Sequence, residues 1–373
     1  MNEDSIPNPD VDVFEDHFAY WNKLPTELKV KVVRNLPYPT LRNFMFLSKD
    51  CMEVSSPLKT PVFAVFLLHW GYRSECVQVG RYDVVKQSSI IVYYMPFGSA
   101  VDRKEYIIYF STVEDGRCIA HREKKRGQIV IMGPEYPKES CFTVSMRVLF
   151  QITKILKPKN ILLQLVNIAD VKSTLSELPS TSFITCGALT VRSDDLSFLP
   201  LLMPHVSPGC ELRFYNSDPY PYDDNILNPV FFDFEVVKAA PYLDTDAICE
   251  INDGQLIQLR ASWLDLKASG ISERGINGLI LQWVEGRRKI VKICILETKT
   301  FNHDLVLENV NTNRIQSSCE NIPFFNKYVE HHPLHKRLAL LRNDFDDRLL
   351  VCIGEDYCEL VDPYSEYMSR TYR

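Results

Sequence analysis

The chain has 373 residues, of which 46% are hydrophobic, and this content supports a globular core and excludes a disordered chain. The formal net charge of -6 leaves no overall basic footprint, so neither nucleic acid nor an anionic membrane surface is favoured as a partner. Eleven cysteines, an odd number without a C-x-x-C pair, indicate free thiols in a reduced compartment. No apolar run approaches the roughly 20 residues of a membrane span, and the N-terminus lacks a secretory apolar run, so we expect a cytoplasmic or nuclear protein.

The N-terminal part predicts a loose tail followed by a helix. Residues 1–17 are polar and acidic and are expected to form the tail. Pro25 suits the first turn of a helix, and Leu28, Val32 and Leu36 then recur every four positions on one stripe. A helix of roughly 12 residues is marginal alone in water, so it must pack on something.

Two more short helices are expected directly after the first. Pro37 and Pro39 end the first helix, because the residue before a proline is pushed out of the α region. Thr40 can cap a second helix over 41–47, and Ser48 can cap a third, short one. Three helices in about 35 residues bury too little of their own surface, so apolar side chains are expected to remain for a partner.

The residues from Trp21 to Lys49 resemble an F-box, the module that docks a substrate receptor onto the Skp adaptor of Skp–cullin–F-box ubiquitin ligases. The resemblance is carried by Trp21, Leu24, Pro25, Glu27, Leu28, Val32, Leu36, Pro39, Leu41, Phe44, Leu47, Ser48 and Lys49. One departure is Cys51, which stands where many F-boxes have a tryptophan. The resemblance implies a three-helix module over 18–58. It also implies an adaptor-binding set of Leu24, Pro25, Leu28, Val32, Leu36, Leu41 and Phe44.

The connecting segment, 59–140, is expected to contain an antiparallel β meander. The apolar run from Pro61 to Trp70 is a buried helix or strand, and its period alone does not separate the two. The period then becomes two over four segments, which are 90–94, 106–110, 118–121 and 128–132. The basic run 122–127 is most simply a solvated hairpin tip, with a phosphate- or nucleic-acid-binding patch as the alternative.

Residues 141–373 alternate between helix and strand patterns. Helices are predicted over 144–156, 171–178, 196–203, 236–243 and 276–284, and they precede strands over 160–165, 188–191, 211–214, 247–251 and 291–296. This alternation favours a parallel sheet with helices laid along it. Uneven spacing argues against a strict repeat, so we expect a curved, irregular, leucine-rich-repeat-like α/β layer that closes with a hairpin of 349–353 and 357–361. The predicted fold class is therefore α+β.

A second resemblance lies inside this layer. The stretches 253–264 and 271–286 resemble the F-box-associated domain of nematode F-box proteins. Ser272 can cap a helix in which Leu279 and Trp283 share a face, and Gly286 can end it in a left-handed conformation. These roles favour core and cap positions over ligand contacts.

Motifs for catalysis or metal binding are not found in the sequence. It has no G-x-S-x-G, P-loop or dinucleotide fingerprint, so we assign no catalytic residue and no cofactor. A surface loop is preferred to a metal site for His331, His332 and His335, because Pro333 separates them. A solvated turn is preferred to a calcium loop for Asp344, Asp346 and Asp347. Small hydrophobic roles are expected for the thiols of Cys141, Cys210 and Cys294.

Three functional hypotheses follow. The first is a non-enzymatic receptor that links an unknown target protein to a Skp-type adaptor, and through it to a cullin. The second is a stand-alone interaction or structural protein in which Leu24, Pro25 and Leu28 pack inward as a cap, whereas the first leaves some of them exposed. The third is an enzyme of unrecognised type, which predicts a deep pocket with converging ionisable groups. The sequence favours the first and expects no nucleic-acid or membrane partner.

Overall fold

The structure is a computed structural model that describes residues 18–36, 38–45, 47–55, 62–72, 78–79, 82–94, 104–124, 128–131, 135–166, 168–217, 225–268, 270–296, 301–316, 327–328, 330 and 337–371. The chain divides into two compact units, each described by itself. The N-terminal unit comprises 1–63 and 92–106, and the α/β unit comprises 64–91 and 107–373.

The N-terminal unit contains short helices. They are η1 (Phe18–Lys23), α1 (Thr26–Arg34), α2 (Tyr38–Met45) and α3 (Lys49–Ser55). Pro25 lies directly before α1, and the hydroxyl of Ser48 accepts from the backbone N–H of Cys51 at 3.1 Å, which caps α3 as expected. Both α1 and α2 pack against α3. The core of this cluster is formed by Trp21, Val33, Leu41, Phe44, Cys51 and Val54.

Two expectations for this unit need correction. The helices do not form a clear three-helix module, because η1 contributes Trp21 to their core and the compact unit also takes in 92–106. Thr40 does not cap α2, since the helix already begins at Tyr38 and Thr40 lies inside it. Pro39 is compatible with this start, because a proline is tolerated in the first turn of a helix.

The chain as a whole is a mixed α/β protein dominated by one large mixed sheet with interspersed helices. The strands are β1 (Val62–Tyr72), β2 (Gln78–Val79), β3 (Tyr82–Tyr94), β4 (Lys104–Val113), β5 (Cys118–Lys124), β6 (Gln128–Ile131), β7 (Asn160–Leu165), β8 (Ala188–Ser193), β9 (Glu211–Asn216), β10 (Ile226–Leu227), β11 (Tyr242–Cys249), β12 (Trp263–Ala268), β13 (Lys292–Leu296), β14 (Ile315–Gln316), β15 (Arg337–Arg342), β16 (Arg348–Ile353) and β17 (Tyr357–Val361).

Strand pairing has a parallel middle and antiparallel ends. From β7 onward, β8, β9, β11, β12 and β13 follow one another in parallel, and β1 pairs in parallel with the other edge of β7. The antiparallel ends are β4–β5–β6 on one side and β13–β17–β16–β15–β14 on the other. The parallel middle arises because the helical segment after each strand returns the chain to the end of the sheet where that strand began, so the next strand runs in the same direction.

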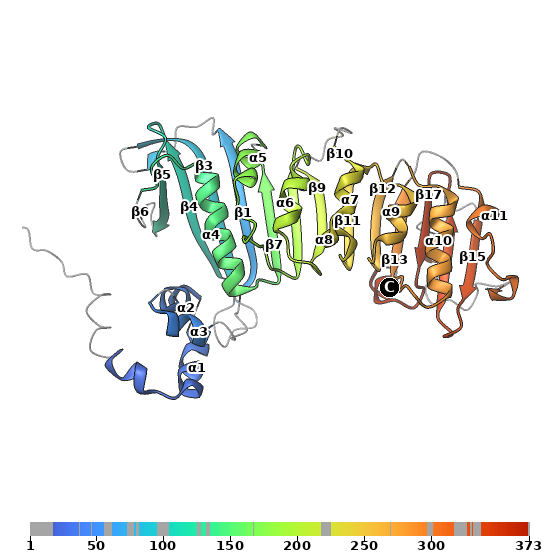
Figure 1. Cartoon of the computed structure of the whole chain (residues 1–373), viewed down its shortest axis with the longest axis horizontal. Coiled ribbons are helices and arrows are strands. Elements are labelled where there is room, and N and C mark those ends of the chain that lie inside the picture. The colour runs from blue at the N-terminus through green and yellow to red at the C-terminus, as the bar shows by residue number, and fades with distance from the viewer. Residues whose placement is uncertain are drawn as a thin grey trace, which may run out of the picture. The chain divides into compact units, whose positions relative to one another are not determined.

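Most helices of the α/β unit lie along one face of the sheet (Figure 1). They are α4 (Cys141–Leu156), α5 (Ile168–Ser176), α6 (Leu199–Leu202) with η2 (Met203–His205), α7 (Pro229–Asp233), α8 (Glu235–Lys238), α9 (Asp253–Gln258), α10 (Glu273–Val284), α11 (His303–Val306) and η3 (Thr312–Arg314). Helix α13 (Glu366–Thr371) packs on the opposite face, where Tyr367 meets Trp263. Strand residues alternate between buried and half-buried in β7, β11 and β12. The main core therefore lies between these helices and one side of the sheet, and a second buried cluster around Tyr328, Leu350 and Met368 covers the other side of the C-terminal strands.

Much of the predicted order is confirmed. The ambiguous apolar run is strand β1, the last strands of the meander pair antiparallel, and the terminal hairpin is β16–β17. Ser272 caps α10 by accepting from Arg274, and Gly286 follows it at φ +70°. Leu279 and Trp283 are buried in the core as predicted.

The helix predicted over 236–243 is present only up to Lys238, and its second half is wrong. α8 ends at Lys238, Pro241 interrupts the helical pattern, and Tyr242 already begins strand β11. The sequence also missed α9, which opens with a reciprocal capping pair between Asn252 and Gln255, and the strand β12.

Candidate functional site

Helix α1 has an inward face and an outward face. Val33 is 0% exposed and Lys29 is buried, one turn apart on the same side. Leu28 is 45% exposed and Val32 is 49% exposed, and they too lie one turn apart. The apolar stripe noticed in the sequence is therefore the outward face, and the core uses its neighbours.

A polar contact fixes the orientation of α1. The indole N–H of Trp21 and the ammonium of Lys29 both donate to one carboxylate oxygen of Asp50, at 2.9 and 3.0 Å. The hydrogen bonds from Lys29 and Trp21 hold the pKa of Asp50 below its usual value. The Trp21 ring also meets Phe44 edge to face, with 5.0 Å between ring centroids. These contacts turn the Lys29 side of α1 inward and leave the Leu28 side in solvent.

The seven predicted adaptor-binding residues fall into three groups in the structure. Pro25, Leu28 and Val32 are exposed, Leu24 and Leu36 are half-buried, and Leu41 and Phe44 belong to the core of the N-terminal unit. The exposed group forms the surface that we call the α1 stripe: Pro25, Leu28 and Val32. Cys51 is buried in that core as well.

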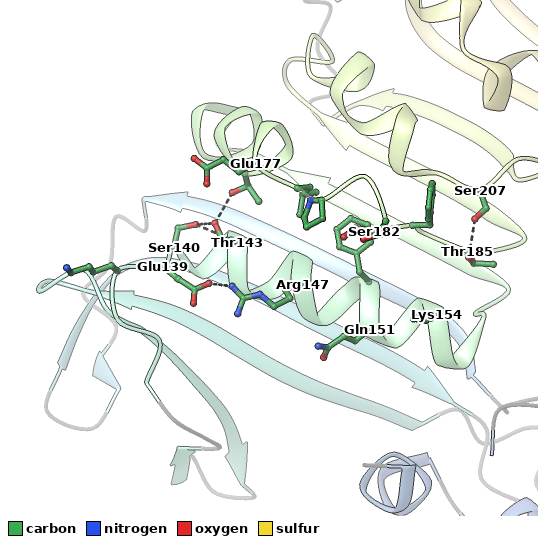
Figure 2. Close-up of a pocket in the computed structure, with 17 residues that line it drawn as sticks. Glu139, Ser140, Thr143, Arg147, Gln151, Lys154, Glu177, Ser182, Thr185 and Ser207 are labelled. Atoms are coloured by element: carbon green, nitrogen blue, oxygen red, sulfur yellow. Dashed lines mark hydrogen bonds and ion pairs between the residues drawn. The ribbon is translucent and has the colours of Figure 1, made fainter. Parts of the chain in front are cut away.

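The α/β unit carries a groove of about 880 Å³ on its helical face. One wall is helix α4, with Ser140 and Thr143 at its start and Lys154 near its end (Figure 2). The other wall is formed by the end of α5 and the segment that follows it up to Thr185. We call this surface the α4 groove. The sequence gave no signal for it, because it is formed by segments that only tertiary packing brings together.

Hydroxyl groups line the groove at both ends. At one end, the oxygens of Ser140, Thr143 and Thr174 form a chain of hydrogen bonds with 2.9 Å at each step. At the other end, the hydroxyls of Thr185 and Ser207 are 3.1 Å apart, and Figure 2 shows both pairings as dashed lines. These hydroxyls hydrogen-bond to one another, which fixes the position of each at its end of the groove.

Charged and aromatic side chains lie between these ends. Arg147 pairs with Glu139, whereas Lys154 is exposed and makes no ion pair with any residue that the structure describes. Phe183 is 47% exposed and Pro179 lies beside it in the groove wall. An exposed aromatic side chain of this kind is typical of protein-binding surfaces.

A second cluster of ionisable groups, away from the α4 groove, lies around Lys292 of strand β13. The ammonium of Lys292 lies 3.1 Å from Asp265 and 3.7 Å from Glu359, and the hydroxyl of Tyr328 donates to Glu359. Burial alone would lower the pKa of Lys292, but the two carboxylates raise it above its usual value. Each charge in this cluster has its partner, which is how structural ion networks are arranged.

Two clusters of residues were compared with metal sites in the sequence, one of aspartates and one of histidines. Asp344 and Asp346 lie in the turn between β15 and β16, where they pair with Arg314 and Arg342 at 2.8 and 2.5 Å. The structure therefore favours a solvated turn over a calcium loop for these aspartates. The three histidines at 331, 332 and 335 lie outside the described residues. Within the described part of the chain, no group of three or more histidine, cysteine or acidic side chains is arranged to hold a metal ion.

The three singled-out thiols have two environments. Cys141, on α4, and Cys210, directly before β9, are buried. Cys294, on β13, is half-buried. The Sγ of Cys210 lies 3.3 Å from the Sγ of Cys186, a contact that the sequence did not indicate.

Comparison with known proteins returned nothing: no family model matches the chain, and neither a curated protein nor a solved structure is significantly similar to it. In the described residues, no helix is long and apolar enough to cross a membrane.

Proposed function

We propose that this chain is a non-enzymatic substrate receptor, in which the N-terminal helices bind a Skp-type adaptor and the α/β unit binds a target protein. The observation that carries the proposal is the α1 stripe, where Pro25, Leu28 and Val32 are exposed although the helix has buried partners on its other side. Apolar side chains aligned on one exposed helix face mark a protein-binding surface.

Part of this proposal is that the N-terminal helices act as an F-box-like module. It rests on the residue order from Trp21 to Lys49 and on the exposure of the stripe. Burying the remaining exposed half of Leu28 and of Val32 would contribute about 1 kcal/mol each at 25 cal/mol per Å². Together with Pro25, these contacts correspond to roughly 30-fold or more in affinity.

The target-binding role is assigned to the α/β unit. We propose that its parallel strands and their helices form the leucine-rich-repeat-like layer expected from the sequence, and that the α4 groove takes part in holding the target. Phe183 and Lys154 offer an exposed apolar and an exposed cationic contact there. Ubiquitin transfer would be catalysed by other subunits, and the receptor would act by raising the effective concentration of a target lysine. A cullin would be reached through the adaptor.

The capping alternative makes the opposite prediction for the same residues. A stand-alone interaction domain with F-box-like helices as a cap requires Leu24, Pro25 and Leu28 to pack inward. Pro25 and Leu28 are exposed and Leu24 is half-buried, which favours the receptor over the cap.

The test is binding of the purified full chain to a purified Skp-type adaptor. The variant carries Pro25→Ala, Leu28→Ala and Val32→Ala, all at exposed positions, so the fold is expected to survive. We expect the dissociation constant to rise by about 30-fold or more. A matched control changes Lys31→Ala and Arg34→Ala, which are exposed polar positions of the same helix, and should bind within about threefold of the wild type.

Two outcomes would remove the proposal. One is a wild-type chain that does not bind the adaptor at all, and the other is a triple variant that binds as the wild type does. Circular dichroism and thermal unfolding of each variant establish that the α/β unit is folded in every comparison.

A further inference from the structure

Two cysteines far apart in the sequence meet at the end of the α4 groove. Cys186 directly follows Thr185 and precedes β8, and Cys210 precedes β9. Their sulfur atoms are 3.3 Å apart, and the Cys210 thiol also donates to the carbonyl oxygen of Cys186 at 2.8 Å. The structure describes both as free thiols.

The backbone on both sides of the pair is held in place. Before it, Ile184 bridges in parallel to Val206, and after it, Ala188 pairs in register with Glu211. Adjacent strands lie about 4.8 Å apart, which is within the Cα separation of about 4.4–6.8 Å that a disulfide spans. The sulfurs would need to approach by about 1.3 Å to reach bonding distance, which side-chain torsions can supply without moving the strands.

Local sequence explains why these two side chains converge. Gly209 has φ +86°, a left-handed conformation that turns the chain immediately before Cys210. Gly187 packs its Cα so closely that a Cβ there would lie 2.8 Å from the carbonyl oxygen of Lys159. These glycines therefore place the two thiols against one another at the start of neighbouring strands.

Access and chemistry favour reaction at this pair. Cys186 is half-buried, so a small oxidant can reach it, whereas Cys210 is only 1% exposed. The hydrogen bond between the two sulfurs lowers the pKa of the Cys210 thiol and, together with burial, raises the pKa of the Cys186 thiol, so that Cys210 is the more readily deprotonated of the two. A thiolate beside a second thiol is the arrangement of a resolving pair.

We propose that Cys186 and Cys210 are a redox-active dithiol that hydrogen peroxide oxidises to an intramolecular disulfide, and thus a modification site at the end of the α4 groove. In the first step a thiolate attacks one peroxide oxygen, the O–O bond breaks, and the sulfur becomes a sulfenic acid as hydroxide leaves and takes a proton. In the second step the other thiol attacks that sulfur, the S–S bond forms, the S–O bond breaks and water leaves. Two thiols and one peroxide thus give one disulfide and two waters, with two electrons passing from the sulfurs to the peroxide.

The test uses the reduced, purified full chain and hydrogen peroxide, followed by thiol alkylation and peptide mapping without reductant. We expect a cross-linked peptide that joins Cys186 to Cys210, lighter by two hydrogen atoms than the reduced pair, which dithiothreitol reverses. Cys186→Ser and Cys210→Ser should each abolish it. Cys294→Ser is the matched control, because Cys294 is also half-buried but has no described sulfur contact, and it should leave the link intact.

The wild-type map decides the matter even where a variant fails to fold. The proposal is overturned if peroxide leaves both thiols reduced, if Cys186 is oxidised to sulfinic acid without a link, or if its disulfide partner is another cysteine. None of these outcomes bears on adaptor binding, so the dithiol and the receptor proposal stand or fall separately.

Discussion

Two adjacent valines on α1 test how the N-terminal unit is built. Val33 is 0% exposed and Val32 is 49% exposed, so the same substitution to alanine probes the core at one position and the α1 stripe at the other. Val33→Ala removes two buried carbons, worth about 1.6 kcal/mol by transfer and about 2 kcal/mol with the cavity that remains. The better helix propensity of alanine returns about 0.5 kcal/mol, which leaves a local loss of about 1.5 kcal/mol.

Val32→Ala should behave differently. At most half of its transfer free energy is realised in the free chain, about 0.8 kcal/mol, and the helix propensity of alanine offsets most of that. The net change in local stability should therefore stay within about 0.5 kcal/mol. In contrast, the adaptor should lose part of its contact, which we expect to weaken binding by about fivefold.

Hydrogen exchange of the α1 amides, measured by mass spectrometry on the full chain, separates these cases. Exchange through local opening should accelerate about tenfold in Val33→Ala and by no more than about twofold in Val32→Ala. Equal acceleration in both variants, or acceleration in Val32→Ala alone, would refute the assignment of inward and outward faces. The receptor proposal would then lose the surface on which it depends.

Three further predictions concern the α/β unit. Burial keeps the pKa of His69 and of His121 at about 4, against about 6.5 in the unfolded chain, so the unfolded state binds more protons between these values. The free energy of unfolding should therefore decrease as the pH is lowered, by about 2 kcal/mol per histidine from pH 7.5 to pH 5. Urea titrations at the two pH values would measure this decrease. Gly187→Ala should cost about 2–3 kcal/mol in urea unfolding, because its Cβ would meet the backbone carbonyl oxygen of Lys159. Phe183→Ala should change the free energy of unfolding by less than about 0.5 kcal/mol yet reduce the amount of target that co-purifies, with adaptor binding unchanged.

Each of these has a matched control. His121→Gln keeps an amide near the Ser111 hydroxyl, which lies 2.9 Å from the imidazole, and should remove about half of the pH dependence. If the pH dependence of stability were unchanged in His121→Gln, burial of His121 would not be one of its sources. Gly116 has φ +82° and open space around it, so Gly116→Ala should lower the free energy of unfolding by only about 1 kcal/mol. An equally small loss in Gly187→Ala would argue against the close approach of Gly187 to the Lys159 carbonyl oxygen. Phe150 is buried, and Phe150→Ala should destabilise the chain where Phe183→Ala does not.

The pH dependence has a clear structural origin. His69 is a fully buried residue of strand β1, and its Nδ1 lies 2.8 Å from the Ser88 hydroxyl. Burial lowers its pKa more than the Asp170 carboxylate, 3.9 Å from Nε2, raises it, and Lys86 pairs with that carboxylate. The stability is therefore complete above the unfolded pKa and is lost as the pH falls toward the folded one.

Local sequence patterns determined the order of most elements. The helix–strand alternation after 141 predicted a parallel layer, and Ser272 and Gly286 marked the ends of α10, because caps and periodicity are properties of neighbouring residues. The same reasoning carried the predicted helix too far beyond Lys238, because the residues from Tyr242 onward pair with β9 and β12 as strand β11.

What surrounds each element was decided by tertiary structure alone. The stripe of Leu28 and Val32 could be found in the sequence, but its exposure follows from Asp50, a residue of another helix, which draws Lys29 and Trp21 inward. Likewise, the α4 groove and the contact of Cys186 with Cys210 join segments that are distant along the chain. Periodicity is a one-dimensional property that tells which residues share a face, whereas the choice of the face that is buried depends on partners that only folding supplies.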